Sequence, residues 1–222
     1  LAKNAKKNLR KIKKIKKINW KKINNLDEKF DWIWACPTET SMGLKIPIKK
    51  LKKICLRTKS NLALDATASF GLESGHNLAD IISYSSCKGL FGLTGASFVA
   101  FNKMPENKIN SFYLNIYNHL QKKMTGPYHS ICSLYEVLKN HNKIRKSVVK
   151  NKDIFMKKMK QWVEFKKENQ PLLCTFVKKK INSSKKNLIL YKPRNNVSGS
   201  VVCHLGEAHL KDQAKGDILK YI

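Results

Sequence analysis

The sequence has few acidic residues and few arginines for a chain so rich in lysine. Asp and Glu number 15 against 45 Lys and Arg, so the formal net charge is +30 over 222 residues, and only four of the basic residues are arginines. Surfaces that clamp phosphates or read bases favour the planar fork of arginine. The lysines are also spread along the chain, as is usual for solvated faces. We therefore disfavour a nucleic-acid-binding protein, which stays the alternative from another functional class.

Signals for metal and membrane binding are also missing. The six cysteines form no Cys-x-x-Cys pair, and no group of His and Cys has the spacing of a zinc site, so we expect no metal. No apolar run approaches the ~18 residues of a membrane span, and no apolar core follows the basic start as in a signal peptide. Scattered cysteines in a chain of this size predict a reduced, cytoplasmic protein with no membrane partner.

Apolar segments between residues 26 and 143 have the length of strands and alternate with crossover segments. This alternation predicts an α/β large domain with a mostly parallel sheet flanked by helices. The first strand is rich in tryptophan and is expected to be buried. The expected strands are 31–36, 61–65, 80–85 and 96–101, and the expected helices are 46–54, 109–123 and 128–141.

Two further units are predicted on either side of the 26–143 domain. Residues 3–25 carry an apolar residue at about every third position among lysines, which predicts a basic helix within a unit of residues 1–25. Residues 144–222 predict a smaller C-terminal α+β domain. Its expected elements are a helix at 144–168, strands at 172–179, 187–191 and 199–204, and a helix from about Lys211.

Two polar segments follow predicted strands, where ligands bind in open α/β sheets. Asp65 closes one strand and leads into small and hydroxyl-bearing residues that end at Gly71. The next strand leads to Ser85-Ser86-Cys87-Lys88 and three glycines, and Lys88 is the only lysine between residues 60 and 101. A lysine at a strand end can be partly desolvated, so that its neutral amine attacks an aldehyde.

Each of these segments also has a purely structural interpretation. Asp65 can cap the turn that follows it. The hydroxyl-rich loop 38–43 can approach a ligand closely or can cap the helix near Pro47. The turn at 124–130 can offer a hydroxyl to a phosphate at a helix start or can be an ordinary cap. These alternatives stay open when each segment is taken alone.

Together the segments resemble class V aminotransferases, a group within fold type I of the pyridoxal-phosphate-dependent enzymes. Their order and spacing are most similar to the aminoethylphosphonate–pyruvate transaminase family, over about residues 30–150. The resemblance implies the large domain of a pyridoxal-phosphate-dependent transferase, in a homodimer with the active site at its interface. The matching motifs are Glu39-Thr40-Ser41-Met42-Gly43, Asp65 to Gly71, Ser85-Ser86-Cys87-Lys88, Phe98-Val99 and Thr125-Gly126-Pro127-Tyr128-His129.

The resemblance also implies a role for five residues. Lys88 would bind pyridoxal 5'-phosphate covalently and shuttle a proton. Asp65 would pair with the pyridinium nitrogen, and Thr40 would contact the ring hydroxyl or the ring edge. Ser86 would bind the cofactor phosphate, and Thr125 would reach the phosphate in the neighbouring subunit. The implied reaction moves an amino group from a small amine or amino acid, aminoethylphosphonate-like, to a 2-oxo acid such as pyruvate.

Three departures from the family pattern bear on activity. No phosphate cup of Gly, Ser and Thr and no stacking aromatic lie upstream of residue 30, so we expect an N-terminally truncated chain. The position before the lysine, often Asn or Gln, is Cys87. Val201 stands where the family binds a substrate anion with arginine, and Arg194 and His204 are the nearest replacements. We expect little turnover of aminoethylphosphonate with pyruvate by this chain alone.

Other members of the class stay open as alternatives. They are an alanine–glyoxylate transaminase, a phosphoserine transaminase, a cysteine desulfurase, and an inactive or split aminotransferase fragment. A desulfurase would need a cysteine on a mobile loop far from the lysine, whereas Cys174 and Cys203 lie in strand-like sequence.

Overall fold

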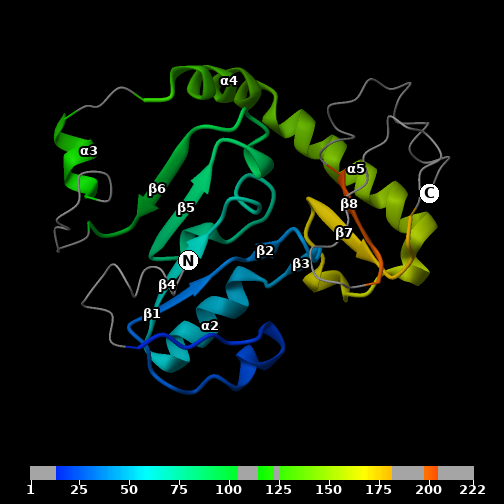
Figure 1. The fold of residues 1–222 in the computed structure, drawn as a ribbon, viewed down its shortest axis with the longest axis horizontal. Helices are drawn as coiled ribbons and strands as arrows, with labels where there is room; N and C mark the ends of the chain where they lie inside the picture. The colour runs from blue at the N-terminus through cyan, green and yellow to red at the C-terminus, as the bar shows by residue number, and fades with distance from the viewer. Residues whose placement is uncertain (1–13, 105–114, 123–125, 182–197, 205–222) are drawn as a thin grey trace.

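A four-stranded sheet in the order β1-β4-β5-β6 forms the core of the larger unit (Figure 1). The computed structural model describes residues 14–104, 115–122, 126–181 and 198–204. Strands β1 (Trp32–Ala35), β4 (Asn61–Asp65) and β5 (Ile81–Ser85) run parallel, and β6 (Ser97–Phe101) is antiparallel to β5. The predicted α/β class with a mostly parallel sheet is therefore confirmed.

Helix α2 (Ile48–Thr58) covers one face of this sheet. Its buried residues recur every three or four positions, which gives the helix one apolar face. That face packs on Leu62 and Leu64 of β4, which are almost fully buried. The helix ends at Thr58, and the capping residue Lys59 has a left-handed backbone (φ 51°) whose N–H donates to the carbonyls of Cys55 and Leu56. The buried residues of α2 are Ile48, Leu51, Ile54, Cys55 and Thr58.

Strand β1 is an edge strand in the described part of the chain, and the prediction that it is buried is wrong. It pairs with β4 on one side only, and its residues alternate between exposed and half-buried. Trp32 is 46% exposed and Trp34 is 58% exposed. Apolar composition alone could not show this, because an edge strand and a central strand can share the same residues.

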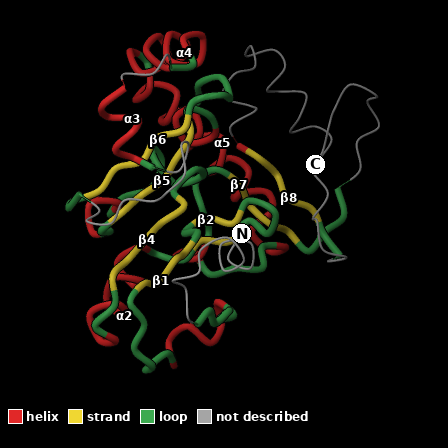
Figure 2. Tube along the Cα trace, turned by 60° about the vertical axis from the view of Figure 1, so that its left-hand side comes forward, coloured by secondary structure: helices red, strands yellow, loops and turns green. Residues whose placement is uncertain are grey.

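A second unit consists of α5 (His141–Met159) and an antiparallel pair of strands, β7 (Cys174–Val177) and β8 (Ser200–Cys203). Phe155 and Met159 of α5 pack against Val177 and Val202 of this pair. In both views the pair lies beside α5 and away from α2 (Figure 1 and Figure 2). Helices α3 (Ile116–Lys122) and α4 (Tyr128–Lys139) precede α5 along the chain.

Two predicted helices differ from the structure. Within the predicted helix 3–25, residues 14–19 are not helical and Trp20–Asn25 forms a 3-10 helix, η1. The predicted helix 144–168 instead starts at His141 and ends at Met159, and Val163 then forms a bridge to Val177 of β7. Pairing with β7 thus replaces the helical hydrogen bonds there. Residues 109–114, 187–191 and the segment from Lys211 lie outside the described residues.

Short elements complete the chain. The hairpin of β2 (Thr38–Glu39) and β3 (Leu44–Lys45) follows β1. Among the described residues, no helix combines the length and the apolar character needed to cross a membrane. The remaining 3-10 helices are η2 (His76–Leu78), η3 (Lys88–Leu90), η4 (Lys160–Trp162) and η5 (Lys167–Asn169).

Candidate functional site at the sheet edge

Three loops meet at one edge of the large sheet because they leave parallel strands at the same end. Asp65 is the last residue of β4 and lies opposite Ser83 of β5 in the strand register. Lys88 follows shortly after β5 ends at Ser85. The structure therefore brings Asp65 and Lys88 to the same edge, next to the hairpin loop that follows β1. Their chemical roles stay predictions.

Glycines let two of these loops pack backbone against backbone. A Cβ on Gly89 would overlap the carbonyl oxygen of Phe70, and a Cβ on Gly71 would lie 2.6 Å from the carbonyl oxygen of Gly89. Gly71 also has a φ of 84°, which side chains rarely adopt. The ring of His141, at the start of α5, forms a 3.2 Å hydrogen bond with the Gly89 carbonyl. The lysine turn is thereby held on the loop that carries Asp65.

Lys88 itself adopts an uncommon backbone conformation. Its φ is 51°, in the left-handed region, which costs a residue with a side chain about 1–2 kcal/mol. Non-glycine residues held in this region often lie at functional sites. The side chain of Lys88 is exposed, so the partial desolvation expected from the sequence is not seen. Among the described residues, the surroundings of Lys88 leave its amine accessible.

Asp65 combines the structural and the chemical interpretation. Its Oδ1 accepts a 3.1 Å hydrogen bond from the backbone N–H of Thr67, so it does cap the turn that follows β4. The residue is nevertheless half-buried, which leaves part of the carboxylate accessible. Capping fixes the carboxylate at the strand end, where a cationic ring nitrogen could pair with it.

The charges of Asp65 and Lys88 both influence the pKa of the Cys36 thiol. Cys36 is an exposed residue, but partial desolvation of its thiol raises the pKa of Cys36 to about 11, and the negative charges of Asp65 and Glu39 act in the same direction. The positive charge of Lys88 opposes them. Asp65 and Lys88 thus act electrostatically on one point just after β1.

The Thr38–Gly43 loop is fixed against β7. Gly43 has a φ of 56°, and a Cβ there would lie 2.5 Å from the backbone nitrogen of Phe176. The thiol of Cys174 lies 3.8 Å from the Thr40 carbonyl oxygen and donates to it. The hydroxyl of Thr38 is buried and has no hydrogen-bond partner among the described residues. Thr40 is half-buried at the same edge.

Ser86 does not present its hydroxyl to a ligand in this structure. The side chain is fully buried, and its Oγ donates to the Leu93 carbonyl at 2.5 Å and accepts from the Ala96 N–H at 3.2 Å. These bonds hold the glycine-rich turn after Lys88. A phosphate contact through this hydroxyl would first have to break them. Thr125, the other predicted phosphate contact, lies outside the described residues.

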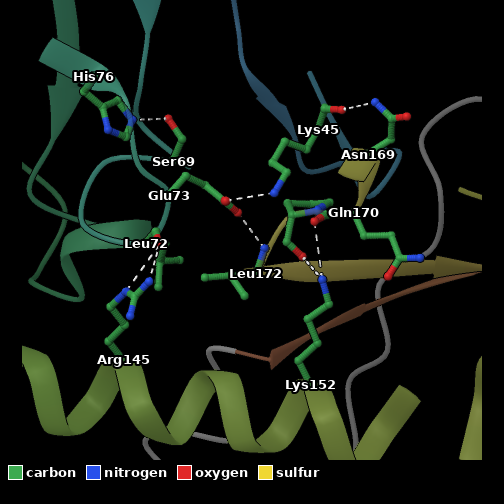
Figure 3. Close-up of polar contacts among 11 residues, drawn as sticks. Lys45, Ser69, Leu72, Glu73, His76, Arg145, Lys152, Asn169, Gln170 and Leu172 are labelled. Atoms are coloured by element: carbon green, nitrogen blue, oxygen red, sulfur yellow. Dashed lines mark hydrogen bonds and ion pairs between the residues drawn. The ribbon is translucent and has the colours of Figure 1, made fainter. Parts of the chain in front are cut away.

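A polar network that the sequence did not reveal joins the site loops to the second unit (Figure 3). Glu73 lies just after the Asp65–Gly71 loop; its carboxylate pairs with Lys45 of β3 at 3.0 Å and accepts from the Leu172 N–H at 2.7 Å. On α5, Arg145 donates to the Leu72 carbonyl at 3.1 Å. Lysine is too common here, and Glu73 is too far along the chain from Lys45 and Leu172, for the sequence to predict such long-range pairing.

Lys152 of α5 is the buried lysine of this network. Its Nζ donates to the carbonyls of Pro171 at 2.8 Å and of Gln170 at 3.4 Å. Burial lowers the pKa of Lys152 to about 8, partly opposed by the negative charge of Glu73. The lysine with the lowered pKa therefore ties α5 to the segment that enters β7, away from Lys88.

The structure rules out one replacement for the missing arginine. His204 is fully buried, and burial lowers its pKa to about 3, so its ring is neutral at pH 7. Its Nε2 lies 2.9 Å from the Thr175 hydroxyl. A neutral, enclosed ring cannot bind a substrate anion by charge. Val201 is buried in β8, and Arg194 lies outside the described residues.

A separate cavity of about 770 Å³ lies beyond the Thr38–Gly43 loop. Ser41 and Met42 form one wall, and Trp20, Phe165 and Phe176 contribute aromatic rings. Neither Lys88 nor Asp65 lines it. The cavity is therefore distinct from the sheet-edge pair.

Neither protein-family models nor curated proteins match this sequence. Solved structures do match in fold. Alanine–glyoxylate aminotransferase from Nostoc sp. is 17% identical with a TM-score of 0.56, over 71% of this chain and 47% of that one. Phosphoserine aminotransferase from Cytophaga hutchinsonii is 14% identical with a TM-score of 0.69, over 86% and 62% of the two chains.

A third structure, a subgroup IV aspartate aminotransferase from Thermus thermophilus, is 12% identical with a TM-score of 0.67, over 90% of this chain and 65% of that one. The chain thus spans between 47% and 65% of the length of these three structures. At such low identity the likeness shows the fold, and the described residues have the fold of these aminotransferases.

Proposed function

We propose that this chain is the cofactor-lysine part of a pyridoxal-phosphate-dependent aminotransferase, with Lys88 as the lysine that carries the cofactor. One observation supports the proposal above all. Asp65 ends β4, and Lys88 follows the end of β5, the adjacent parallel strand, at the same edge of the sheet. In a fold shared with aminotransferases, an amine that can bind an aldehyde and a carboxylate that can pair with a ring nitrogen suit a pyridine aldehyde such as pyridoxal phosphate.

Pyridoxal phosphate supplies an aldehyde that binds amines and a ring that withdraws electrons from them. The residues present fit the aldehyde and the ring. Lys88 would hold the group through Nζ, which is accessible, and would later carry a proton at that same atom. Asp65 would keep the ring nitrogen protonated, and Thr40 would contact the ring edge. The phosphate fits less well, because the Ser86 hydroxyl is engaged by the backbone, and its binding would fall to Thr125.

The proposed substrates are a small amino donor resembling aminoethylphosphonate and a 2-oxo acid acceptor such as pyruvate. The order and spacing of the motifs support this choice over alanine–glyoxylate or phosphoserine transamination. The proposed assembly is a cytoplasmic homodimer in which Thr125 reaches the neighbouring active site. Because the arginine position is Val201 and His204 is neutral, the anion-binding cation must lie elsewhere.

Cofactor attachment tests the role of Lys88 most simply. Protein incubated with pyridoxal phosphate should acquire an absorption band of the bound cofactor, and borohydride should fix the cofactor covalently. Lys88→Ala should lose both signals. Lys59→Ala is the matched control, since Lys59 is also exposed and has the same φ of 51°. Equal attachment in the two variants would refute the proposal.

A second pair of variants tests Asp65. Asp65→Asn should keep the covalent attachment but weaken cofactor affinity and slow chemistry by several kcal/mol in the barrier, as when a buried ion pair loses one partner. Asp80→Asn is the control, because Asp80 also lies beside β4, where it accepts from the Leu62 N–H at 2.8 Å. If Asp65→Asn matched wild type in affinity and spectrum, Asp65 would not be the pyridinium partner.

A further inference from the structure

Cys174 and Cys203 face each other across the β7–β8 pair. They are direct partners in the antiparallel register. The N–H of His204 donates to the Leu173 carbonyl at 2.8 Å, one position outside the cysteines. This pattern makes Cys174 and Cys203 a non-hydrogen-bonded pair, in which the Cα atoms approach to about 4.5 Å and the side chains lie closest. A disulfide requires Cα atoms about 4.4–6.8 Å apart, and the usual spacing of a non-hydrogen-bonded pair falls within that range.

Both side chains lie on the same face of the strand pair, because direct partners in a sheet point the same way. Cys174 is buried and Cys203 is half-buried, so Cys203 is the more accessible residue of the two. Both are reduced in this structure. Burial raises the pKa of Cys174 to about 12, and the charge of Cys203 acts in the same direction.

We propose that Cys174 and Cys203 form a reversible disulfide when the protein meets a low-molecular-weight disulfide such as oxidised glutathione. The Cys203 thiolate attacks the disulfide, whose S–S bond breaks and releases one glutathione thiol. Cys174 then loses its proton and attacks the Cys203 sulfur of the mixed disulfide, which releases the second glutathione thiol. Two protein thiols are oxidised to one disulfide, and one glutathione disulfide is reduced to two thiols.

The pair is connected to the sheet-edge loop. The Cys174 thiol is a donor to the Thr40 carbonyl, at 3.8 Å, and a disulfide has no S–H to donate. Oxidation would therefore remove one contact that holds the Thr38–Gly43 loop on β7. The disulfide does not depend on the proposed aminotransferase function, because its formation needs only the β7–β8 register.

Mass spectrometry of the full chain tests the proposal. The protein is incubated with oxidised glutathione, free thiols are blocked, and the digest is mapped without reduction. We expect a Cys174–Cys203 cross-linked peptide as the main disulfide, and its reversal by dithiothreitol with the circular dichroism spectrum unchanged. Formation should become faster as the pH rises, because Cys174 must lose its proton. Hydrogen exchange of residues 39–43 should become faster in the oxidised form.

Single variants identify the order of the steps. Cys174→Ser should stop at a mixed disulfide between glutathione and Cys203, whereas Cys203→Ser should leave Cys174 reduced. Cys55→Ser is the control, because Cys55 is equally buried but lies in α2, and it should form the cross-link like wild type. The proposal is overturned if, after incubation of the wild-type protein with oxidised glutathione, all of Cys174 still reacts with the thiol-blocking reagent. It is also overturned if Cys174 is linked to any other cysteine.

Discussion

The sheet edge around Lys88 and the buried contact around Lys152 place a lysine amine in opposite surroundings. Lys88 is exposed, in a strained backbone conformation, on a turn held by glycines. Lys152 is buried in a regular helix, its amine donates to two carbonyls, and its pKa is lowered to about 8. A lowered pKa is often used as a sign of function. Here it marks the lysine that fastens α5 to the segment entering β7.

The comparison shows which feature distinguishes the candidate among so many lysines. Lys88 stands out by its position after the end of a parallel strand, at the same sheet edge as Asp65; its left-handed conformation is shared with Lys59. Burial instead selects Lys152, whose contacts are all structural. The following variants should separate the two regions.

Gly89→Ala should have the largest effect on stability, about 3 kcal/mol, because the new methyl group would overlap the backbone of Phe70. Urea unfolding would measure it. Gly126→Ala, whose methyl group would meet only the end of the Ile131 side chain at 3.4 Å, should cost less than about 1 kcal/mol. Equal losses in the two variants would show that the two site loops do not pack backbone against backbone.

Glu73→Gln should cost about 2 kcal/mol, because Lys45 loses its ion pair and a charge-assisted hydrogen bond to Leu172 is weakened. The exposed pair of Glu136 with Lys139 offers a control, and Glu136→Gln should change stability by less than about 0.5 kcal/mol. If Glu73→Gln lost no more stability than Glu136→Gln, the contacts of Glu73 would not help to hold the two units together.

Stability should rise between about pH 8 and pH 10.5 because of Lys152. Its pKa is lowered from 10.5 in the unfolded chain to about 8 in the fold, so the unfolded chain binds more protons in this window. The gain should be on the order of 1–3 kcal/mol. Lys152→Met should flatten the rise relative to Lys157→Met, an exposed position on the same helix. Parallel pH profiles for the two variants would contradict the assignment.

Lys88→Gly should increase stability by about 0.5–1 kcal/mol, because glycine adopts a φ of 51° without strain. Lys59→Gly should give a similar gain, since Lys59 has the same φ. The two variants should differ in cofactor attachment, which only Lys88→Gly should lose. A destabilised Lys88→Gly protein would mean that the lysine side chain supports the fold.

The sequence predicted the parts of the fold that depend on local pattern. Strands β4, β5 and β6 and helix α2 follow the apolar periodicity, and parallel strands then bring Asp65 and Lys88 to one edge. The prediction of a basic helix is wrong at residues 14–19, because apolar spacing alone does not show what the helix would pack against. The prediction of a helix over 144–168 is wrong after Met159, where the chain pairs with β7 instead of continuing the helix.

Side-chain orientation and long-range pairing could not be predicted in the same way. The Ser86 hydroxyl is buried because residues 93–96 fold back over it and bond to it. The motif around Ser86 does not predict this contact with residues further along the chain. Likewise the Leu172 N–H donates to Glu73 only because the segment that enters β7 packs beside the loop after β4, a contact between residues far apart in the sequence. The neutral state of His204 follows from burial between α5 and β7, which the spacing of charges does not show.

The site at which pyridoxal phosphate attaches to the wild-type chain directly tests the role of Lys88. The complex is reduced with borohydride and digested, and the modified lysines are quantified by mass spectrometry over a range of cofactor concentrations. We predict that the peptide containing Lys88 is modified first and saturates at the lowest concentration, with Lys152 unmodified. Equal modification of many surface lysines, or preferential modification of Lys152, would show that Lys88 is not the cofactor lysine.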